Sequence, residues 1–225
     1  MMITAIQALL FDFDGLILDT ETPELRVWKK IYAEYGFEYP LERGLKNVGR
    51  WGNTAFDPAA YLHEITHDSL DQKAIRIRHH DESTVLIERQ PVGEGLEEYM
   101  SEARRLGLRL AVASSSPRSW VEPHLSRLGL VHRFDMIITG DDVAPERVKP
   151  HPDIYVKTVE HLGVAPAQAI AFEDSPPGVA AARAAGIFVV AVPNPTTAQL
   201  DLGGANLVVA SLTALPLPDL LQRAV

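Results

Sequence analysis

Short apolar runs of strand length alternate with stretches of helical periodicity over most of this chain, and this alternation constrains the fold more than any other feature. In the helical stretch that follows Pro91, apolar side chains recur three to four residues apart until Gly107 ends the pattern. Regular alternation of this kind is typical of βαβ units with right-handed crossovers. We therefore expect an α/β fold with a parallel sheet covered by helices on both faces. Its strands are expected at residues 6–11, 108–113, 136–139, 169–172, 188–192 and 207–208.

The alternation is interrupted once, directly after the first strand. Up to about Arg89, helical patches are separated by polar and glycine-bearing turns, and no segment has a convincing strand pattern. Residues 21–89 are therefore predicted to form an α-helical insertion. The core is expected to consist of residues 1–20 and 90–225.

Composition limits the classes of function. The chain has 225 residues, of which 46% are hydrophobic and 23% charged, as in an ordinary globular protein with a substantial core. Because it has no cysteine, disulfides and thiolate-bound metal sites are excluded. A formal net charge of -9 argues against nucleic acid and anionic membrane as partners. The amino terminus lacks a basic-then-apolar signal pattern, so we expect a cytoplasmic location.

Two aspartates follow the first predicted strand, in the segment Leu10-Phe-Asp-Phe-Asp-Gly-Leu-Ile-Leu-Asp-Thr-Glu21. Ligands of open parallel sheets gather at the carboxyl ends of strands, which is where Asp12 and Asp14 are expected. Two like charges this close, beside phenylalanines, stay ionised only with a cation or donors nearby. A divalent metal is therefore the natural partner, and Gly15 allows the backbone to approach a ligand closely.

Three later segments place polar side chains beside other strand ends or helix starts. Ser114, Ser115 and Ser116 precede Pro117, which suits the first position of a helix, so hydroxyls and free N–H groups meet at a potential anion site. Lys149 lies between a strand and a helix in a proline-stiffened segment, and the pair 173–174 (Glu-Asp) ends another strand. Taken singly, each segment has an ordinary interpretation: a capped helix, a solvated lysine or an acidic turn. Together they gather acids, hydroxyls and one lysine at one edge of the sheet.

The four segments resemble, in order and spacing, the motifs of the haloacid dehalogenase superfamily, in its β-phosphoglucomutase-like branch of phosphatases and phosphomutases. The matching residues are Asp12-Phe13-Asp14-Gly15, Ser114, Lys149 to Asp153, and Glu173-Asp174-Ser175. This resemblance implies a Rossmann-like core, with the insertion at residues 21–89 as a mobile α-helical cap. The loop 46–50 is also similar to the substrate-specificity loop of that branch.

The resemblance implies a phosphatase that acts on a small phosphorylated metabolite, with a sugar phosphate as the expected substrate. Asp12 is then the nucleophile that becomes an aspartyl phosphate, and Asp14 the general acid and base. Lys149 offsets negative charge, while Ser114 donates to a phosphoryl oxygen. The further substrate-binding candidates are Ser115, Ser116, Arg50 and Glu24.

A Mg²⁺ ion is the cofactor that the resemblance implies. Its protein ligands are then Asp12, the backbone carbonyl of Asp14, and Asp174, with water completing an octahedron. Glu173 holds the ion either directly or through water, and the sequence leaves this open.

Two other functions use the same motifs. A β-phosphoglucomutase-like isomerase is the first, but Glu24 stands where that mutase has a histidine. A phospho-ligand-binding regulator without turnover is the second, and the complete motif set disfavours it. A dehalogenase would not need Asp14 or the acidic pair. The identity of the substrate stays open, and we expect a monomer or a weak homodimer.

One rival motif lies inside the insertion. His63-Glu64-Ile65-Thr66-His67 fits the His-Glu-x-x-His pattern of zinc proteases, in which both histidines lie on one helical face. A zinc site of this type needs a third ligand, and no clear candidate follows in the sequence. We therefore favour the magnesium site.

Overall fold

The computed structural model describes residues 6–50, 55–67 and 69–224. It contains a parallel sheet in the order β3-β2-β1-β4-β5-β6. The strands are β1 (Ala8–Phe11), β2 (Arg109–Ala113), β3 (Met136–Ile138), β4 (Ala169–Glu173), β5 (Phe188–Ala191) and β6 (Leu207–Val208). Each lies within one residue or two of its predicted range, so the expected α/β class is confirmed. β4 extends one residue further than expected, which places Glu173 inside the strand.

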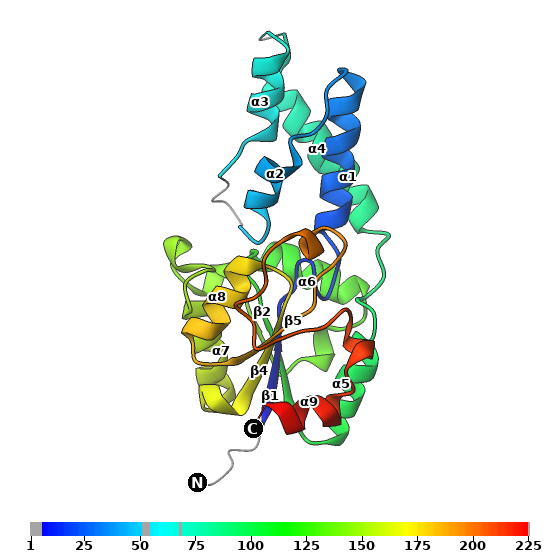
Figure 1. Cartoon of the computed structure of the whole chain (residues 1–225). Helices are drawn as coiled ribbons and strands as arrows, with labels where there is room; N and C mark the ends of the chain where they lie inside the picture. Colours follow the sequence, from blue (N-terminus) through cyan, green and yellow to red (C-terminus); the bar gives the residue numbers. More distant parts are fainter. Residues whose placement is uncertain (1–5, 51–54, 68, 225) are drawn as a thin grey trace.

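Helices cover both faces of this sheet (Figure 1). One apolar layer holds Leu9 and Phe11 of β1, and the other holds Ala8 and Leu10. Because side chains alternate along a strand and both faces are covered, β1 is apolar at every position. The first layer is closed by α5 (Leu96–Arg105), α6 (Arg118–Arg127) and α9 (Leu217–Arg223). The second is closed by α7 (Asp153–Leu162) and α8 (Pro176–Ala184).

The first four helices after β1 form a group that stands over the carboxyl ends of the strands (Figure 1). Its helices are α1 (Glu21–Glu34), α2 (Leu41–Gly44), α3 (Pro58–Ile65) and α4 (Gln72–Ile87). The group has an apolar cluster of its own, separate from the two layers of the sheet, in which Ile31, Tyr32 and Leu62 are fully buried. None of the helices in the described part of the chain has the length and apolar character that a membrane crossing requires.

Candidate active site

The acidic residues meet at the point where the sheet reverses its strand order. From β1 the chain proceeds outward through β2 to β3, and then returns to the other side of β1 as β4. A crevice forms at such a switch point, outside the carboxyl ends of the strands. Asp12 directly follows β1. The pair 173–174 lies at the end of β4, the strand that pairs with β1. The local sequence and the topology together therefore place these carboxylates side by side.

Lys149 binds two of the acids at once. Its ammonium nitrogen lies 2.7 Å from Asp12 Oδ1 and 2.7 Å from Glu173 Oε1, and its side chain is only 2% exposed. Burial lowers the pKa of Lys149, but the charges of Asp12 and Glu173 outweigh that effect and raise it. The lysine is therefore a fixed positive charge beside the predicted nucleophile. Oδ1 of Asp12 also accepts the Phe13 N–H at 2.7 Å, which leaves Oδ2 without a donor among the described residues.

Glu173 is held by more than the lysine. The Tyr155 hydroxyl donates to the same oxygen, Oε1, at 2.5 Å. Burial and the neighbouring charge of Asp12 raise the pKa of Glu173 to about 7, against the lowering effect of Lys149. Gly178 makes room for this carboxyl, because a Cβ there would lie 1.9 Å from Oε2. Hydrogen bonds to Oε1 and close packing of Oε2 against Gly178 therefore both restrict the orientation of the Glu173 carboxyl.

Asp174 is oriented by Asn194, a residue that the sequence analysis missed. The Asn194 amide donates to Asp174 Oδ2 at 2.9 Å and to the Gly15 carbonyl at 3.1 Å. Gly15 has a φ of +80°, and a Cβ on it would lie 1.9 Å from the same carboxylate oxygen. Only glycine therefore lets Asp174 come this close to the first motif. Burial, followed by the charge of Asp12, raises the pKa of Asp174 well above its usual value.

The donor set fits a divalent metal. One oxygen each of Asp12, Glu173 and Asp174 lie within 4.8 Å of one another, all buried, and this is the one such group among the described residues. Carboxylate oxygens are the ligands that Mg²⁺ prefers. Three acids against the single charge of Lys149 leave excess negative charge, which the raised pKa values of Glu173 and Asp174 reflect.

The Asp14 carboxyl has hydrogen-bond partners of its own. Ser116 Oγ lies 2.5 Å from its Oδ2, and the Trp120 indole N–H donates to its Oδ1 at 2.8 Å. Burial raises the pKa of Asp14 to about 6 and outweighs these hydrogen bonds, which lower it. A carboxyl with such a pKa can both release and take up a proton near neutral pH, as general acid–base catalysis requires.

The three serines lie beside this carboxyl. Ser114 is fully buried, and its Oγ accepts the Ser116 N–H at 3.0 Å, so its own hydrogen can point toward a ligand. The Ser115 hydroxyl accepts the Lys149 N–H at 3.2 Å and thereby joins two of the motifs. Gly140 permits this packing, because a Cβ there would lie 2.3 Å from the Ser115 carbonyl oxygen.

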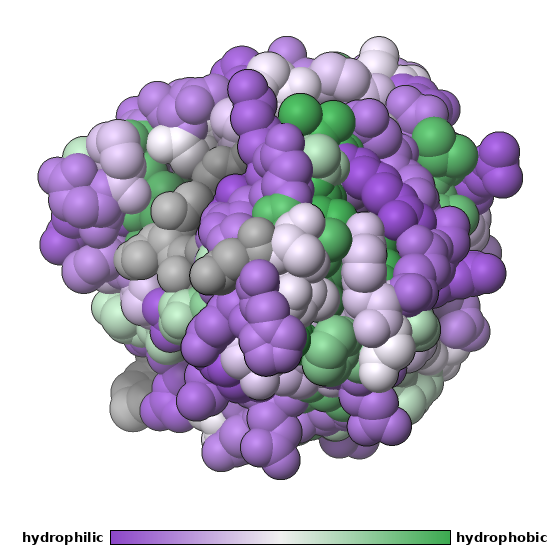
Figure 2. Space-filling model, turned by 90° about the horizontal axis from the view of Figure 1, so that it is seen from above, coloured by the Kyte–Doolittle hydropathy of each residue, from purple (hydrophilic) through white to green (hydrophobic). Residues whose placement is uncertain are grey.

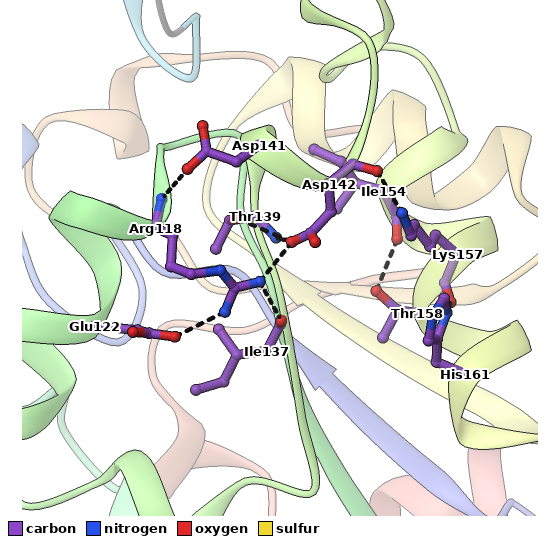
Figure 3. A network of polar contacts seen from close by, with 10 residues as sticks. All are labelled: Arg118, Glu122, Ile137, Thr139, Asp141, Asp142, Ile154, Lys157, Thr158 and His161. Carbon is purple, nitrogen blue, oxygen red and sulfur yellow. Dashed lines mark hydrogen bonds and ion pairs between the residues drawn. The ribbon is translucent and has the colours of Figure 1, made fainter.

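An ionic network anchors the start of α6, which carries Trp120 (Figure 3). The Arg118 guanidinium donates to Glu122 and to Asp142 Oδ2, both at 2.7 Å, while its backbone N–H donates to Asp141 at 2.8 Å. Asp142 in turn caps the turn after β3 through the Thr139 N–H. The serine segment and the first turn of α6 are therefore tied to the neighbouring strand.

A cavity of about 360 Å³ connects this site with the helical insertion. Asp12, Asp14, Lys149 and all three serines line it. The predicted substrate-binding residues Arg50 and Glu24 line it as well, so the structure brings together all the side chains predicted to touch the substrate. The view from above, onto the insertion, shows hydrophobic side chains gathered between hydrophilic ones (Figure 2).

The Glu24 carboxyl faces the cavity without a hydrogen-bond donor among the described residues. Its side chain is open to solvent along the cavity, and partial desolvation there, followed by the charge of Asp14, raises its pKa to about 7. Glu21, one helical turn away on α1, has its pKa raised by burial and by the charge of Glu24, although it accepts a backbone N–H from Gly49. The neighbouring charges that raise the two pKa values are those of other acids. The side of the cavity formed by α1 is therefore acidic, while Arg50 and Arg76 line other parts of it.

The His-Glu-x-x-His pattern does not form a metal site. Helix α3 ends at Ile65, and His67 lies beyond it with a φ of +58°, so the two histidines do not share a helical face. His63 Nδ1 instead lies 2.7 Å from the Leu70 carbonyl oxygen. Neither histidine belongs to a metal-binding group within the part of the chain that the structure describes.

Asn194, Tyr155 and Trp120 complete the site, although none was predicted. Asn194 follows β5 between two prolines, and this strand-end position was the signal available in the sequence. Tyr155 and Trp120 lie in the first turns of α7 and α6, where their apolar character resembles that of ordinary core residues.

Comparison with known proteins agrees with this geometry. The profile of the haloacid dehalogenase-like hydrolases matches residues 9–192. The Bacillus subtilis protein named "Putative phosphatase YhcW" is 42% identical over 195 residues, which cover 87% of each chain. The "Phosphorylated carbohydrates phosphatase" of Thermotoga maritima is 31% identical over 207 residues, which cover 90% of this chain and 94% of that one.

The fold matches a solved structure of the same branch. The crystal structure titled "putative beta-phosphoglucomutase from Thermotoga maritima" superposes with a TM-score of 0.71 at 28% identity. The match covers 91% of this chain and 94% of that chain. The superfamily and its β-phosphoglucomutase-like branch, both expected from the sequence motifs, are confirmed.

Proposed function

Because this chain belongs to the haloacid dehalogenase-like hydrolase family, we propose that it is a Mg²⁺-dependent phosphatase of small sugar phosphates that works through an aspartyl phosphate. One observation carries the proposal: Lys149 holds the oriented carboxylate of Asp12 beside two further buried acids at the switch point of the sheet. Mg²⁺ bound by Asp12, Glu173, Asp174 and the Asp14 carbonyl would neutralise charge on the phosphate and lower its repulsion from the nucleophile.

The residues of the chain account for both half-reactions. In the first, Asp12 attacks phosphorus, Ser114 donates to a phosphoryl oxygen, and Lys149 offsets the negative charge. Asp14 gives its proton to the departing ester oxygen. In the second, the ionised Asp14 takes a proton from water as the water attacks the aspartyl phosphate, which restores Asp12 and releases phosphate.

The helical insertion acts as a cap in this proposal. It supplies Glu24 and Arg50 to the cavity wall opposite the catalytic residues, and closing it over the substrate would exclude water. A mobile cap would also explain how the substrate reaches carboxylates that are almost fully buried.

The acidic wall of the cavity favours a sugar monophosphate. Carboxyl groups whose pKa values are raised, as those of Glu21 and Glu24 are, can hold a proton and so donate as well as accept hydrogen bonds with hydroxyls. In their ionised form they would repel a second phosphate at the same place. The name of the Thermotoga maritima relative, a phosphatase of phosphorylated carbohydrates, supports the same class of substrate.

The proposal is tested by measuring phosphate release from a panel of sugar phosphates, with Mg²⁺ and with EDTA, beside an assay for conversion of glucose 1-phosphate to glucose 6-phosphate. We expect phosphate release that requires Mg²⁺. The Asp12→Asn variant should fold, by circular dichroism, and lose at least about 99% of the activity, a barrier increase of about 2.7 kcal/mol or more. Retention of a tenth of the activity by this variant would remove Asp12 as the nucleophile. Isomer formation without phosphate release would instead establish the mutase.

A further inference from the structure

We propose that Trp120 is a positioning residue that determines which oxygen of Asp14 carries the catalytic proton. The inference rests on the proposed phosphatase function, in which Asp14 protonates the leaving group. Trp120 belongs to none of the motifs from which the site was predicted. It lines the cavity, and the role proposed for it runs through its hydrogen bond to Asp14.

The two oxygens of Asp14 have different nearest partners, and the Thr20 side chain adds a further hydrogen bond to the carboxyl. Trp120 Nε1 lies 2.8 Å from Oδ1, and Ser116 Oγ lies 2.5 Å from Oδ2. An indole N–H can only donate, whereas a serine hydroxyl can donate or accept. Oδ1 must therefore act as an acceptor whenever Trp120 is in contact. When Asp14 is protonated, its proton is confined to Oδ2, where the Ser116 hydroxyl can turn to accept it.

Trp120 is itself held firmly. Its ring packs edge-on against His124, with 4.4 Å between centroids, and His124 lies 6.3 Å from the ring of Phe13, the residue between the two catalytic aspartates. The Arg118 network fixes the same turn of α6 to the end of β3. The indole donor is therefore placed by packing on one side and by ionic contacts on the other.

The consequence concerns the first half-reaction. As the bond from Asp12 to phosphorus forms and the ester P–O bond breaks, the Asp14 proton moves from Oδ2 to the ester oxygen, which leaves as an alcohol. Asp14 is then ionised, and Trp120 and Ser116 donate to its two oxygens. Without the indole N–H, either oxygen can carry the proton and the carboxyl can rotate, so that fewer encounters have the proton aimed at the leaving oxygen.

The dependence on the leaving group tests this role. The Trp120→Phe variant keeps an aromatic ring at this position and removes the N–H donor together with part of the ring volume, so Trp120→His is needed to separate the two effects. For glucose 6-phosphate, whose alkoxide needs a proton to leave, kcat/KM should fall about tenfold, a fraction of what general acid catalysis contributes. For p-nitrophenyl phosphate, which releases a stable anion, it should change less than about twofold. Because kcat/KM reports only steps up to leaving-group departure, it is not affected by the later hydrolysis of the aspartyl phosphate.

Two further variants complete the experiment. Ser119→Ala, an exposed position in the same turn of α6, should leave both values unchanged. Trp120→His, which restores a ring N–H, should recover part of the loss on glucose 6-phosphate. If the phenylalanine variant is unstable, the ratio of the two kcat/KM values in the histidine variant is compared with the wild-type ratio and should lie close to it. Equal losses on both esters, or no rescue by histidine, would overturn the inference while leaving the phosphatase intact. Absence of phosphate release from the wild-type protein would instead refute the proposed function.

Discussion

Replacing Lys149 by methionine tests how the buried charges of the site are balanced. Each contact of the ammonium group at 2.7 Å is worth about 6 kcal/mol of gross attraction at an effective dielectric constant of about 20. Desolvation of the three groups offsets most of that attraction. Removing one partner from a buried ion pair nevertheless costs about 3–5 kcal/mol, because the remaining charge stays buried without compensation.

The loss should depend on pH because Glu173 can take up a proton. Its pKa is already about 7 with Lys149 present, compared with 4.5 for the unperturbed group, and loss of the lysine raises it further. A carboxyl whose pKa is raised in the fold binds a proton that the unfolded chain has released, so stability falls as the pH rises. In the wild-type protein this fall ends near pH 7, whereas in the variant it continues above pH 7.

The assay is denaturant unfolding in the presence of EDTA at pH 6, 7, 8 and 9. We expect the free energy of unfolding of Lys149→Met to be about 3 kcal/mol lower than that of the wild-type protein at pH 7. This difference, the stability gap, should widen by up to about 1.4 kcal/mol per pH unit above pH 7. Lys29→Met, an exposed position on α1, is the matched control and should show no gap. A gap that is constant with pH, or smaller than about 1 kcal/mol, would refute this account of the charge balance.

Three further predictions address the cavity wall, the glycine behind Glu173 and the packing of the insertion. Arg50→Ala should lower kcat/KM strongly for the preferred sugar phosphate and much less for p-nitrophenyl phosphate, because a guanidinium in the cavity wall can bind only a substrate that has a distal end; equal effects in a comparison of the two would contradict a role in specificity. Gly178→Ala should destabilise the protein by about 1–3 kcal/mol and reduce activity, since its Cβ would overlap the Glu173 carboxyl; an unchanged melting temperature would show that the carboxyl can move aside. Burial lowers the pKa of His79 from 6.5 to about 4, so the unfolded chain takes up the proton first as the pH falls. Between pH 6.5 and pH 4 the free energy of unfolding of the wild-type protein should fall by up to about 3 kcal/mol. In His79→Phe this fall should be smaller, as measured by unfolding curves recorded from about pH 7 to pH 4.

The sequence was sufficient for those features that depend on local pattern and strand order. Asp12 and Asp174 could be placed together because each ends an apolar run, and the carboxyl ends of parallel strands share one edge. Asn194 could not be assigned to Asp174 in the same way, because an amide after a strand has no charge pattern of its own and the contact depends on how the loop after β5 folds back.

Side-chain direction was the second limit. Trp120 has the spacing of an apolar helix residue, and only the position of α6 against β1 turns its N–H toward Asp14. His67 shows the opposite case. The motif predicts a continuous helix through it, but the chain leaves the helix at Ile65 and enters the left-handed region two residues later, at a residue other than glycine.

The central position of β1 also has a consequence for how the protein acquires its structure. Ala8 pairs with Arg109 on one side and with Ala169 on the other. Both strands that pair with β1, which precedes the nucleophile, are therefore distant from it in the sequence. Closing loops of this length is entropically costly, and chains dominated by distant pairings fold slowly. During synthesis, which proceeds from the amino terminus, β1 must wait as an unpaired apolar segment until more than a hundred further residues have emerged, and such segments are prone to aggregate. The acids of the site, which repel one another, come together only when β4 docks. The assembly of the catalytic centre is therefore a late event in folding, and a metal ion that neutralises those acids would favour its completion.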